Sequence, residues 1–303
     1  MNLRLTPIVA IFLAACTTAP PPEAIAVPPS PPPPPPPVLA VDPPKVADAP
    51  EGDRWLYGSG ESSATSLQTY RTLTDYALGK ARNRPANSVV LKPGSSPTDT
   101  APLAFEACGN KPLAFIFDAD ETLIWNIPPT RAFAEKGVDW DGDIWDRWEA
   151  TGAGHATAMP GAVDALAALR KAGITPIVNT NRVAKNAAGT AATLQAAGLG
   201  SYVHGETLFL KNDDDLGSSK DGRRARIAAK WCVIGMAGDQ LGDFSNAFNV
   251  KGLGIVARKA AAFGGPASSL WGRGWFLQSN PTYGPGLDGG HDYDAIYGKD
   301  DWN

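Results

Sequence analysis

Apolar and polar positions change in blocks from about residue 110 onward, and the blocks predict strands and helices in turn. Short apolar runs of strand length occur at residues 115–117, 174–178, 207–210, 232–237 and 252–256. Helical spacing of apolar residues occupies intervals between them, at 161–171, 184–197 and about 221–230. Because strands that alternate with helices form parallel sheets, we predict an α/β fold with a doubly wound parallel sheet.

The first strand leads straight into two acids, Asp118 and Asp120. A buried strand cannot keep two carboxylates inside the sheet, so both should lie just past its carboxyl end, where open α/β sheets bind ligands. An Asp in front of an apolar segment can also serve only as a helix cap. The pair alone does not decide between a cap and a chemical site.

The interval between this strand and Pro160 does not follow the alternation. It is rich in tryptophan, with Trp140, Trp145 and Trp148 close together, and it shows no regular spacing. We therefore predict an irregular cap inserted after the first strand, at roughly residues 125–159.

The later strands also end on polar residues. In chain order these are Thr180, then Lys211 or Lys220, then Asp239 and Asp243. The carboxyl ends of parallel strands meet at one edge of the sheet. These side chains should therefore converge with Asp118 and Asp120 on one site.

Four motifs in this order resemble the haloacid dehalogenase superfamily of phosphotransferases. A closer similarity is to the class C acid phosphatases, lipid-anchored outer-membrane enzymes of bacteria. The similarity rests on Asp118-Ala119-Asp120-Glu121-Thr122, Val178-Asn179-Thr180-Asn181-Arg182, Gly238-Asp239-Gln240-Leu241-Gly242-Asp243-Phe244 and Asn280-Pro281-Thr282-Tyr283-Gly284. It implies a phosphatase domain over residues 53–303.

The resemblance gives each motif residue a role in phosphoryl transfer. Asp118 would attack phosphorus and form an aspartyl-phosphate, and Asp120 would protonate the leaving oxygen and then deprotonate the attacking water. Thr180 would hydrogen-bond a phosphoryl oxygen, and Lys220 would neutralise its charge. Lys211 is the alternative lysine, but the position of Lys220 at the start of a helix favours Lys220.

A divalent cation is expected in the site, because carboxylates and a phosphate repel one another. Mg²⁺ prefers oxygen ligands, and we expect Asp118 and Asp239 as side-chain ligands, with the backbone carbonyl of Asp120 added by the resemblance. Asp243 would hold a water ligand or orient Lys220. A helix cap is the alternative role for Asp243.

Substrate choice should come from the cap and from a late loop rich in Gly and Pro. We expect Trp145 and Tyr283 to stack on a nucleobase or pyridine ring, which stabilises binding by about 1–3 kcal/mol per base. Packing within the cap is the alternative for each tryptophan. The resemblance implies that Asn181 and Arg182 bind substrate and that the substrates are nucleoside or nicotinamide monophosphates. Glu121 is expected to be structural.

The amino terminus resembles that of a bacterial lipoprotein. Residues 1–15 have a positive start and an apolar run too short to span a bilayer, which predicts a cleaved signal peptide. Leu13-Ala14-Ala15-Cys16 is similar to the lipoprotein box, so Cys16 should carry lipid and place the protein at the outer membrane of a bacterial cell envelope. Residues 16–52 hold more than half of the chain's 28 prolines, which predicts an extended stalk.

Charge and cysteine content fit an exported enzyme. A formal net charge of −4 argues against binding of a nucleic acid polymer. Once Cys16 is assigned to lipid, Cys108 and Cys232 remain as an even pair near the amino-terminal ends of two strands. They form either a disulfide or two buried free thiols, in both cases distant from the acids. The sequence leaves the oligomeric state open.

Three functions remain, from different classes. The favoured one is a magnesium-dependent acid phosphatase that acts on small phosphomonoesters. A phosphotransferase or a dehalogenase could use the same fold, but Asp120 argues against a dehalogenase, which has no alkoxide to protonate. A surface antigen with a silent site is the third, and the intact motifs argue against it.

Overall fold

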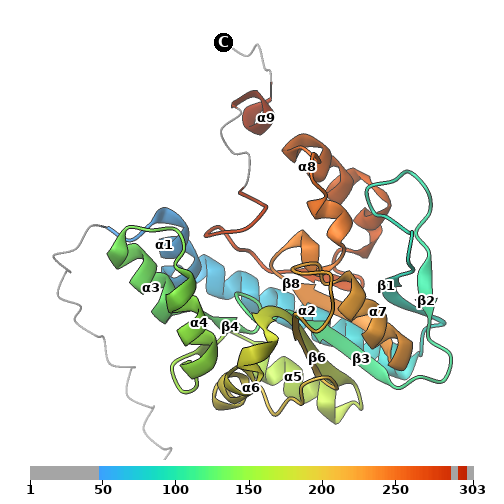
Figure 1. The fold of residues 1–303 in the computed structure, drawn as a ribbon. Helices are drawn as coiled ribbons and strands as arrows, with labels where there is room; N and C mark the ends of the chain where they lie inside the picture. The colour runs from blue at the N-terminus through green and yellow to red at the C-terminus, as the bar shows by residue number, and fades with distance from the viewer. Residues whose placement is uncertain (1–47, 288–292, 299–303) are drawn as a thin grey trace, which may run out of the picture. The chain divides into compact units, whose positions relative to one another are not determined.

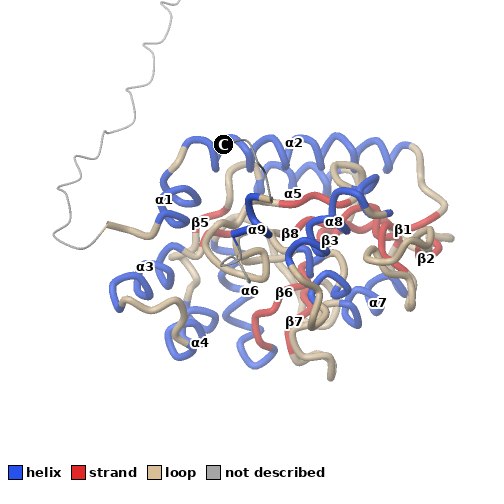
Figure 2. The backbone as a smooth tube through the Cα atoms, turned by 90° about the horizontal axis from the view of Figure 1, so that it is seen from above, coloured by secondary structure: helices blue, strands red, loops and turns tan. Residues whose placement is uncertain are grey.

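The computed structural model describes residues 48–287 and 293–298 (Figures 1 and 2). The expected signal peptide at 1–15, Cys16 and nearly all of the expected stalk at 16–52 lie outside the described residues. Among the helices that the structure describes, none has both the length and the apolar character needed to cross a bilayer.

A five-stranded parallel sheet forms the centre of the described part. Its strands are β3 (Leu113–Phe117), β6 (Thr175–Val183), β7 (Leu208–Lys211), β8 (Cys232–Gly238) and β9 (Trp275–Leu277). They follow the spatial order β7-β6-β3-β8-β9, and each neighbouring pair is parallel. The prediction of an α/β fold with a doubly wound parallel sheet is confirmed.

Both faces of the sheet are apolar, because successive side chains of β3 point to opposite sides. Phe115 and Phe117 belong to one core, and Ala114 and Ile116 belong to the other. The first face is covered by α2 (Gly60–Arg82), α5 (Ala162–Lys171) and α6 (Ala187–Ala196), which follows the short turn η1 (Ala184–Asn186). The second is covered by α7 (Asp221–Lys230) and by β1 (Asn87–Leu91), which pairs with β2 (Phe105–Ala107).

The strand predicted at 252–256 is wrong. Ile255–Gly264 is the helix α8, in which no residue is buried, and Val256 is 60% exposed. A short apolar run next to a glycine is too short to show whether apolar residues recur with the period of a strand or of a helix. The alanines that follow favour the helix. The fifth strand is instead β9, the short apolar segment Trp275–Leu277.

The predicted irregular cap is also wrong in one respect, because the insertion after β3 is regular. It contains the antiparallel strands β4 (Ile124–Trp125) and β5 (Thr157–Ala158) and the helices α3 (Ile127–Lys136) and α4 (Gly142–Thr151). Prolines occupy the first turn of α3, and Asp141 caps α4 by accepting the backbone N–H groups of Asp143 and Ile144, both at 3.0 Å. Two ten-residue helices that bury few side chains give too weak a period to be seen in the sequence.

Helices α1 (Glu51–Gly58), α3 and α4 gather at one end of this unit, and the β1–β2 pair lies at the opposite end (Figures 1 and 2). Glu121, just past β3, accepts a hydrogen bond from Tyr57 of α1 at 3.0 Å. The carboxyl ends of the strands therefore face the first group of helices. A last short helix, α9 (Tyr293–Tyr297), follows near the carboxyl terminus.

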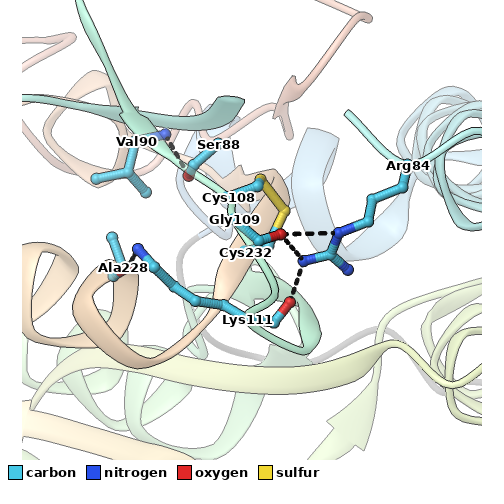
Figure 3. The surroundings of a disulfide bond; sticks show 8 residues. All are labelled: Arg84, Ser88, Val90, Cys108, Gly109, Lys111, Ala228 and Cys232. Atoms are coloured by element: carbon cyan, nitrogen blue, oxygen red, sulfur yellow. Dashed lines mark hydrogen bonds between the residues drawn. A yellow bond between two sulfur atoms is a disulfide. The ribbon is translucent and has the colours of Figure 1, made fainter. Parts of the chain in front are cut away.

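A disulfide joins Cys108 to Cys232 at the other edge of the sheet, with the Cα atoms 4.5 Å apart (Figure 3). Of the two states that the sequence left open, the structure has the bonded one. Arg84 donates to the backbone carbonyls of Gly109 and Lys111 beside it. This edge carries the amino-terminal ends of β3 and β8, so the disulfide is structural and lies away from the acids.

Candidate active site

Asp118 begins the site, as the first residue beyond β3. Its backbone N–H donates to the carbonyl of Ala237 at 2.9 Å, which fixes it beside the end of β8. Its Oδ1 accepts from Nζ of Lys220 at 2.5 Å, and the same Nζ donates to Oδ1 of Asp243 at 2.7 Å. All three side chains are buried. Lys220, rather than Lys211 at the end of β7, is the lysine that reaches the nucleophile position.

Three buried carboxylates meet at this point. One oxygen each from Asp118, Asp239 and Asp243 lies within 4.8 Å of the other two. Asp239 is fixed by Asn280, whose Nδ2 donates to it at 2.8 Å, and by the hydroxyl of Thr122 at 3.3 Å. The loops after β3, β8 and β9 therefore all contribute to the cluster.

Burial makes simultaneous ionisation of these acids costly. It raises the pKa of Asp239 to about 7, with the charge of Asp243 adding to the rise. Burial likewise raises the pKa of Asp118 well above its ordinary value, although Lys220 opposes the shift. A cation between the carboxylates would remove this cost, and hard oxygen donors are the ligands that Mg²⁺ and similar ions prefer. The cluster fits a divalent metal.

Asp120 turns away from this cluster toward Arg182. Nε of Arg182 donates to Oδ1 of Asp120 at 2.9 Å and to Oδ2 at 3.2 Å, and Nη2 donates to Oδ1 at 2.8 Å. Burial would lower the pKa of Arg182, but the charge of Asp120, its hydrogen bonds to Arg182 and the charges of Glu149 and Glu121 together outweigh burial and raise that pKa. The side chain of Arg182, which we expected to bind substrate, is fully buried and holds Asp120; its contact with substrate stays a prediction.

Asn126 was missed in the sequence, although it contacts two of the three acids of the first motif, Asp120 and Glu121. Its Nδ2 donates to Oδ1 of Asp120 at 3.0 Å and to Oε2 of Glu121 at 2.9 Å. Its Oδ1 accepts from Nε1 of Trp148 at 2.7 Å and from Nη2 of Arg182 at 3.1 Å. The available signal was an Asn directly before a helix, which on its own predicts only a cap.

Glu121 ties together three segments that are far apart in the sequence. It is fully buried and accepts from the hydroxyl groups of Tyr57 and Tyr283 and from the backbone N–H of Asn126. Burial raises the pKa of Glu121 to about 7, with Asp120 adding to the rise. Its φ of 51° lies in the left-handed region, a strained conformation held by these contacts. This arrangement agrees with a structural role.

The carboxyl-terminal part of β6 is fixed by α7. The buried Thr180 accepts at Oγ1 from the backbone N–H of Arg182 at 3.2 Å. Arg223 donates to the carbonyl of Thr180 and, at 2.6 Å, to Oδ1 of Asn181. Asn181 is exposed, as expected for a residue that meets substrate. Arg223 therefore positions the carboxyl-terminal part of β6.

Comparison with known protein families shows to which family this chain belongs. A model of the HAD superfamily, subfamily IIIB (acid phosphatase), matches residues 71–286. The chain belongs to this family. Two solved structures share the fold of the acid phosphatase. The structure of the class C acid phosphatase from Bacillus anthracis has a TM-score of 0.62 at 21% identity and covers 83% of this chain and 89% of that one.

The second is a crystal structure of the class C acid phosphatase from Bacillus anthracis with tungstate bound. Its TM-score is 0.61 at 23% identity, over 82% of this chain and 90% of that one. At such identities the likeness supports the fold, while the family match supports the phosphatase activity. HAD phosphatases use a divalent metal, and the three buried carboxylates of the acid phosphatase could bind one.

The aromatic residues expected to select substrate lie beside the acid phosphatase site. The half-buried ring of Trp145 lies 5.9 Å from the guanidinium carbon of Arg182 and 5.0 Å from the ring of Trp140. Nε1 of Trp145 donates to Oε1 of Glu149 at 2.7 Å. Tyr283 is 40% exposed, with its hydroxyl turned inward to Glu121. Stacking on a base stays a prediction for both rings.

Proposed function

We propose that the protein is a lipid-anchored, Mg²⁺-dependent acid phosphatase of the bacterial outer membrane that hydrolyses nucleoside or nicotinamide monophosphates through an aspartyl-phosphate. The observation that carries the chemistry is the contact of Lys220 with both Asp118 and Asp243, next to Asp239. A carboxylate held by a lysine at the end of a central strand is suited to attack an anionic phosphate.

The proposed reaction follows from which oxygen atoms are engaged. Lys220 binds Oδ1 of Asp118, so Oδ2 attacks phosphorus while the bond from phosphorus to the ester oxygen breaks. Asp120 gives its proton to that oxygen and then takes one from the water that cleaves the aspartyl-phosphate, which frees Asp118. When bound by Asp118, Asp239 and Asp243, a Mg²⁺ ion would neutralise charge on the carboxylates and the phosphoryl group.

The resemblance and the aromatic cap support the substrate class. Trp145 offers a flat ring beside Arg182, with the ring of Trp140 next to it. Tyr283 offers one beside Glu121, and such rings suit a leaving group that carries an aromatic base, such as a nucleoside. The anchor and the location rest on the lipoprotein box at Cys16. Replacing Cys16 with Ser should move the enzyme from the membrane fraction to the soluble fraction, and retention in the membrane would contradict the anchor.

The mechanism is tested with p-nitrophenyl phosphate at mildly acidic pH. We expect hydrolysis that requires Mg²⁺, that stops with EDTA and that Asp118→Asn reduces to background. Activity that survives both treatments would rule out the nucleophile and the metal. The substrate class is tested by kcat/KM on a panel of phosphomonoesters. An unchanged preference for nucleotides in Trp145→Ala and Tyr283→Ala would rule out the stacking roles.

A further inference from the structure

We propose that Arg182, Asn126 and Trp148 form a positioning relay that holds the carboxyl group of Asp120 with Oδ2 toward the leaving oxygen. Through this relay the position of the cap helix α4 governs proton delivery. The inference rests on the proposed role of Asp120 as proton donor. These positioning residues act on Asp120 and have no contact with the reacting phosphorus.

The orientation of Asn126 is fixed by the chemistry of its neighbours. The indole of Trp148 and the guanidinium of Arg182 can only donate, so the atom that both contact must be the amide oxygen of Asn126. The amide nitrogen then has two N–H groups left, and both point to carboxylates, Asp120 and Glu121. Every hydrogen-bonding position of this side chain is used.

The two oxygen atoms of Asp120 differ in their surroundings. Oδ1 accepts three hydrogen bonds at 2.8 to 3.0 Å, two from Arg182 and one from Asn126. Oδ2 accepts one, from Nε of Arg182 at 3.2 Å. An oxygen surrounded by three donors has no room for a proton, so the proton of the neutral acid belongs on Oδ2. In catalysis the Oδ2–H bond breaks and the proton moves to the ester oxygen, which keeps the electron pair of its broken bond to phosphorus.

The relay is buried from end to end. The exposed fractions are 8% for Asp120, 1% for Asn126, 1% for Arg182 and 7% for Trp148. Removal of one member leaves donors or acceptors without a partner and without water to replace it, which is costly in a buried site. Asp120 would then lose its fixed orientation even where the fold survives.

Helix α4 is tied to the same strand end that carries Arg182. Glu149, next to Trp148, accepts from the backbone N–H of Val183 at 2.9 Å. The guanidinium carbon of Arg182 lies 6.0 Å from the ring of Trp148. Gly189 of α6 permits this close docking, since a Cβ there would lie 2.5 Å from the carbonyl oxygen of Glu149. A shift of α4 must therefore move Trp148, Asn126 and Asp120 together.

The relay predicts a dependence on the leaving group. An alkoxide leaves only if it receives a proton, whereas p-nitrophenolate is a stabilised anion that leaves without one. Loss of a general acid costs about 100-fold to 10,000-fold where the proton is required. Misorientation of Asp120 should thus reduce hydrolysis of an alkyl phosphate and largely spare that of p-nitrophenyl phosphate. A residue needed only for folding would reduce both equally.

The test compares kcat/KM for a nucleoside 5′-monophosphate, an alkyl ester, with kcat/KM for p-nitrophenyl phosphate in the full-length enzyme with Mg²⁺. The constant kcat/KM reports the steps up to loss of the leaving group, whereas kcat also contains the cleavage of the aspartyl-phosphate by water, in which Asp120 takes part for both substrates. Asn126→Ala should lower the ratio by about 10-fold or more, and Trp148→Phe, which keeps an aromatic ring but removes the N–H donor together with part of the ring, by roughly 3-fold. Trp275→Phe is the matched control, because its indole donates to the carbonyl of Val89 at 3.0 Å on the far side of the sheet. That variant should keep the wild-type ratio.

Asp120→Asn separates the relay from the proposed function. A selective loss on the nucleotide in Asp120→Asn, shared by Asn126→Ala and Trp148→Phe, supports the relay. The same loss in Asp120→Asn with a wild-type ratio in both other variants overturns the relay and leaves the phosphatase mechanism intact. Equal loss on both substrates in Asp120→Asn overturns the acid role itself. If Asn126→Ala does not fold, Trp148→Phe alone decides.

Discussion

Asp239 is a buried acid, and its ionised form is disfavoured by burial and by the negative charge of Asp243. Its pKa in the folded, metal-free protein is about 7, whereas the ordinary value is 3.8, and burial is the main cause. Between these two values the folded state holds a proton that the unfolded state has lost. The free energy of unfolding must therefore fall as the pH rises through this window, since stability decreases wherever the native state binds more protons.

We predict that the metal-free enzyme in EDTA unfolds at a lower urea concentration at about pH 8 than at about pH 5.5. Mg²⁺ should raise the midpoint more at the higher pH, because it binds the ionised carboxylates. Urea titrations at the two pH values measure both effects. Asp239→Asn is the control and should flatten the pH dependence in EDTA; a midpoint that instead rises with pH in the wild-type apoenzyme would contradict the assignment.

Gly238 shows how little space surrounds the metal-binding carboxylates. A Cβ at this position would lie 2.2 Å from Oδ2 of Asp243 and 2.4 Å from its Cβ. Gly238→Ala should displace Asp243, weaken metal binding and lower the free energy of unfolding by about 1–3 kcal/mol, the usual cost of overpacking. Isothermal titration with Mg²⁺ and urea unfolding measure the two effects.

Gly79 is the matched control for that substitution. It lies within α2, and no atom lies within 4 Å of the position that its Cβ would take. Gly79→Ala should raise the free energy of unfolding by about 0.5–1 kcal/mol through helix propensity and leave Mg²⁺ affinity unchanged. Equal Mg²⁺ affinity in the Gly238 and Gly79 variants would show that Asp243 does not need its present position.

At the scale of elements, α7 serves the site with three cations from its first turn. Lys220 binds the carboxylates, Arg223 fixes the carboxyl-terminal part of β6, and Arg224 fixes the loop after β8. Nη1 of Arg224 donates to the carbonyls of Gly242 and Asp243 at 3.0 and 2.8 Å. One helix therefore sets the spacing between two motif loops.

We predict that Arg224→Met lowers the free energy of unfolding by about 2–4 kcal/mol, because two buried carbonyls lose their charged donor. It should also raise the Mg²⁺ concentration needed for half-maximal activity, since the turn that carries Asp243 loosens. Arg226→Met, two residues along the same helix and 47% exposed at its side chain, should cost less than about 1 kcal/mol. Comparable losses in the two variants would argue against the role of Arg224.

Elements with a strong period could be predicted from the sequence. α5, α7 and β6 to β8 fall close to where apolar spacing put them, because the two helices each pack apolar side chains into one core and the strands bury side chains in both. α8 could not be predicted, because it buries no side chain and its first two residues form a short apolar run like that of a strand. β9 is only three residues long and depends on pairing with β8, a contact distant in sequence.

At the scale of the whole molecule, the disulfide joins segments separated by 124 residues. Closing so long a loop restricts the unfolded chain, so we predict that the Cys108→Ala/Cys232→Ala double variant loses about 3–5 kcal/mol of stability. The site is at the other edge of the sheet, so kcat at low temperature should stay near the wild-type value. Thermal unfolding and kcat for p-nitrophenyl phosphate measure the two; a variant of wild-type stability but low kcat would contradict this separation.

The site residues also fall into two groups: those that the pattern of strands and helices locates, and those whose contacts join segments far apart in the sequence. Asp118, Thr180 and Asp239 lie at or near the carboxyl ends of strands and Lys220 lies at the start of a helix, positions that a pattern of alternating elements locates. The role of Arg182 was not visible, because it depends on a hydrogen bond between two strand ends. Tyr57 and Asn126 reach Glu121 from α1 and the cap, and no spacing along the chain encodes such meetings.

Helix α1 limits how far the chain can be trimmed from its amino terminus. Tyr57 donates to Glu121, and Gly52 lies so close to the late loop that a Cβ would be 2.4 Å from the carbonyl oxygen of Pro281. A protease that cuts before Pro50 leaves these contacts in place, so with the anchor proposed at Cys16 we expect such a cut to release an intact catalytic domain. A cut inside α1 removes a segment that lines the site and should inactivate the enzyme. The cuts that release the enzyme and the cuts that inactivate it therefore lie only a few peptide bonds apart.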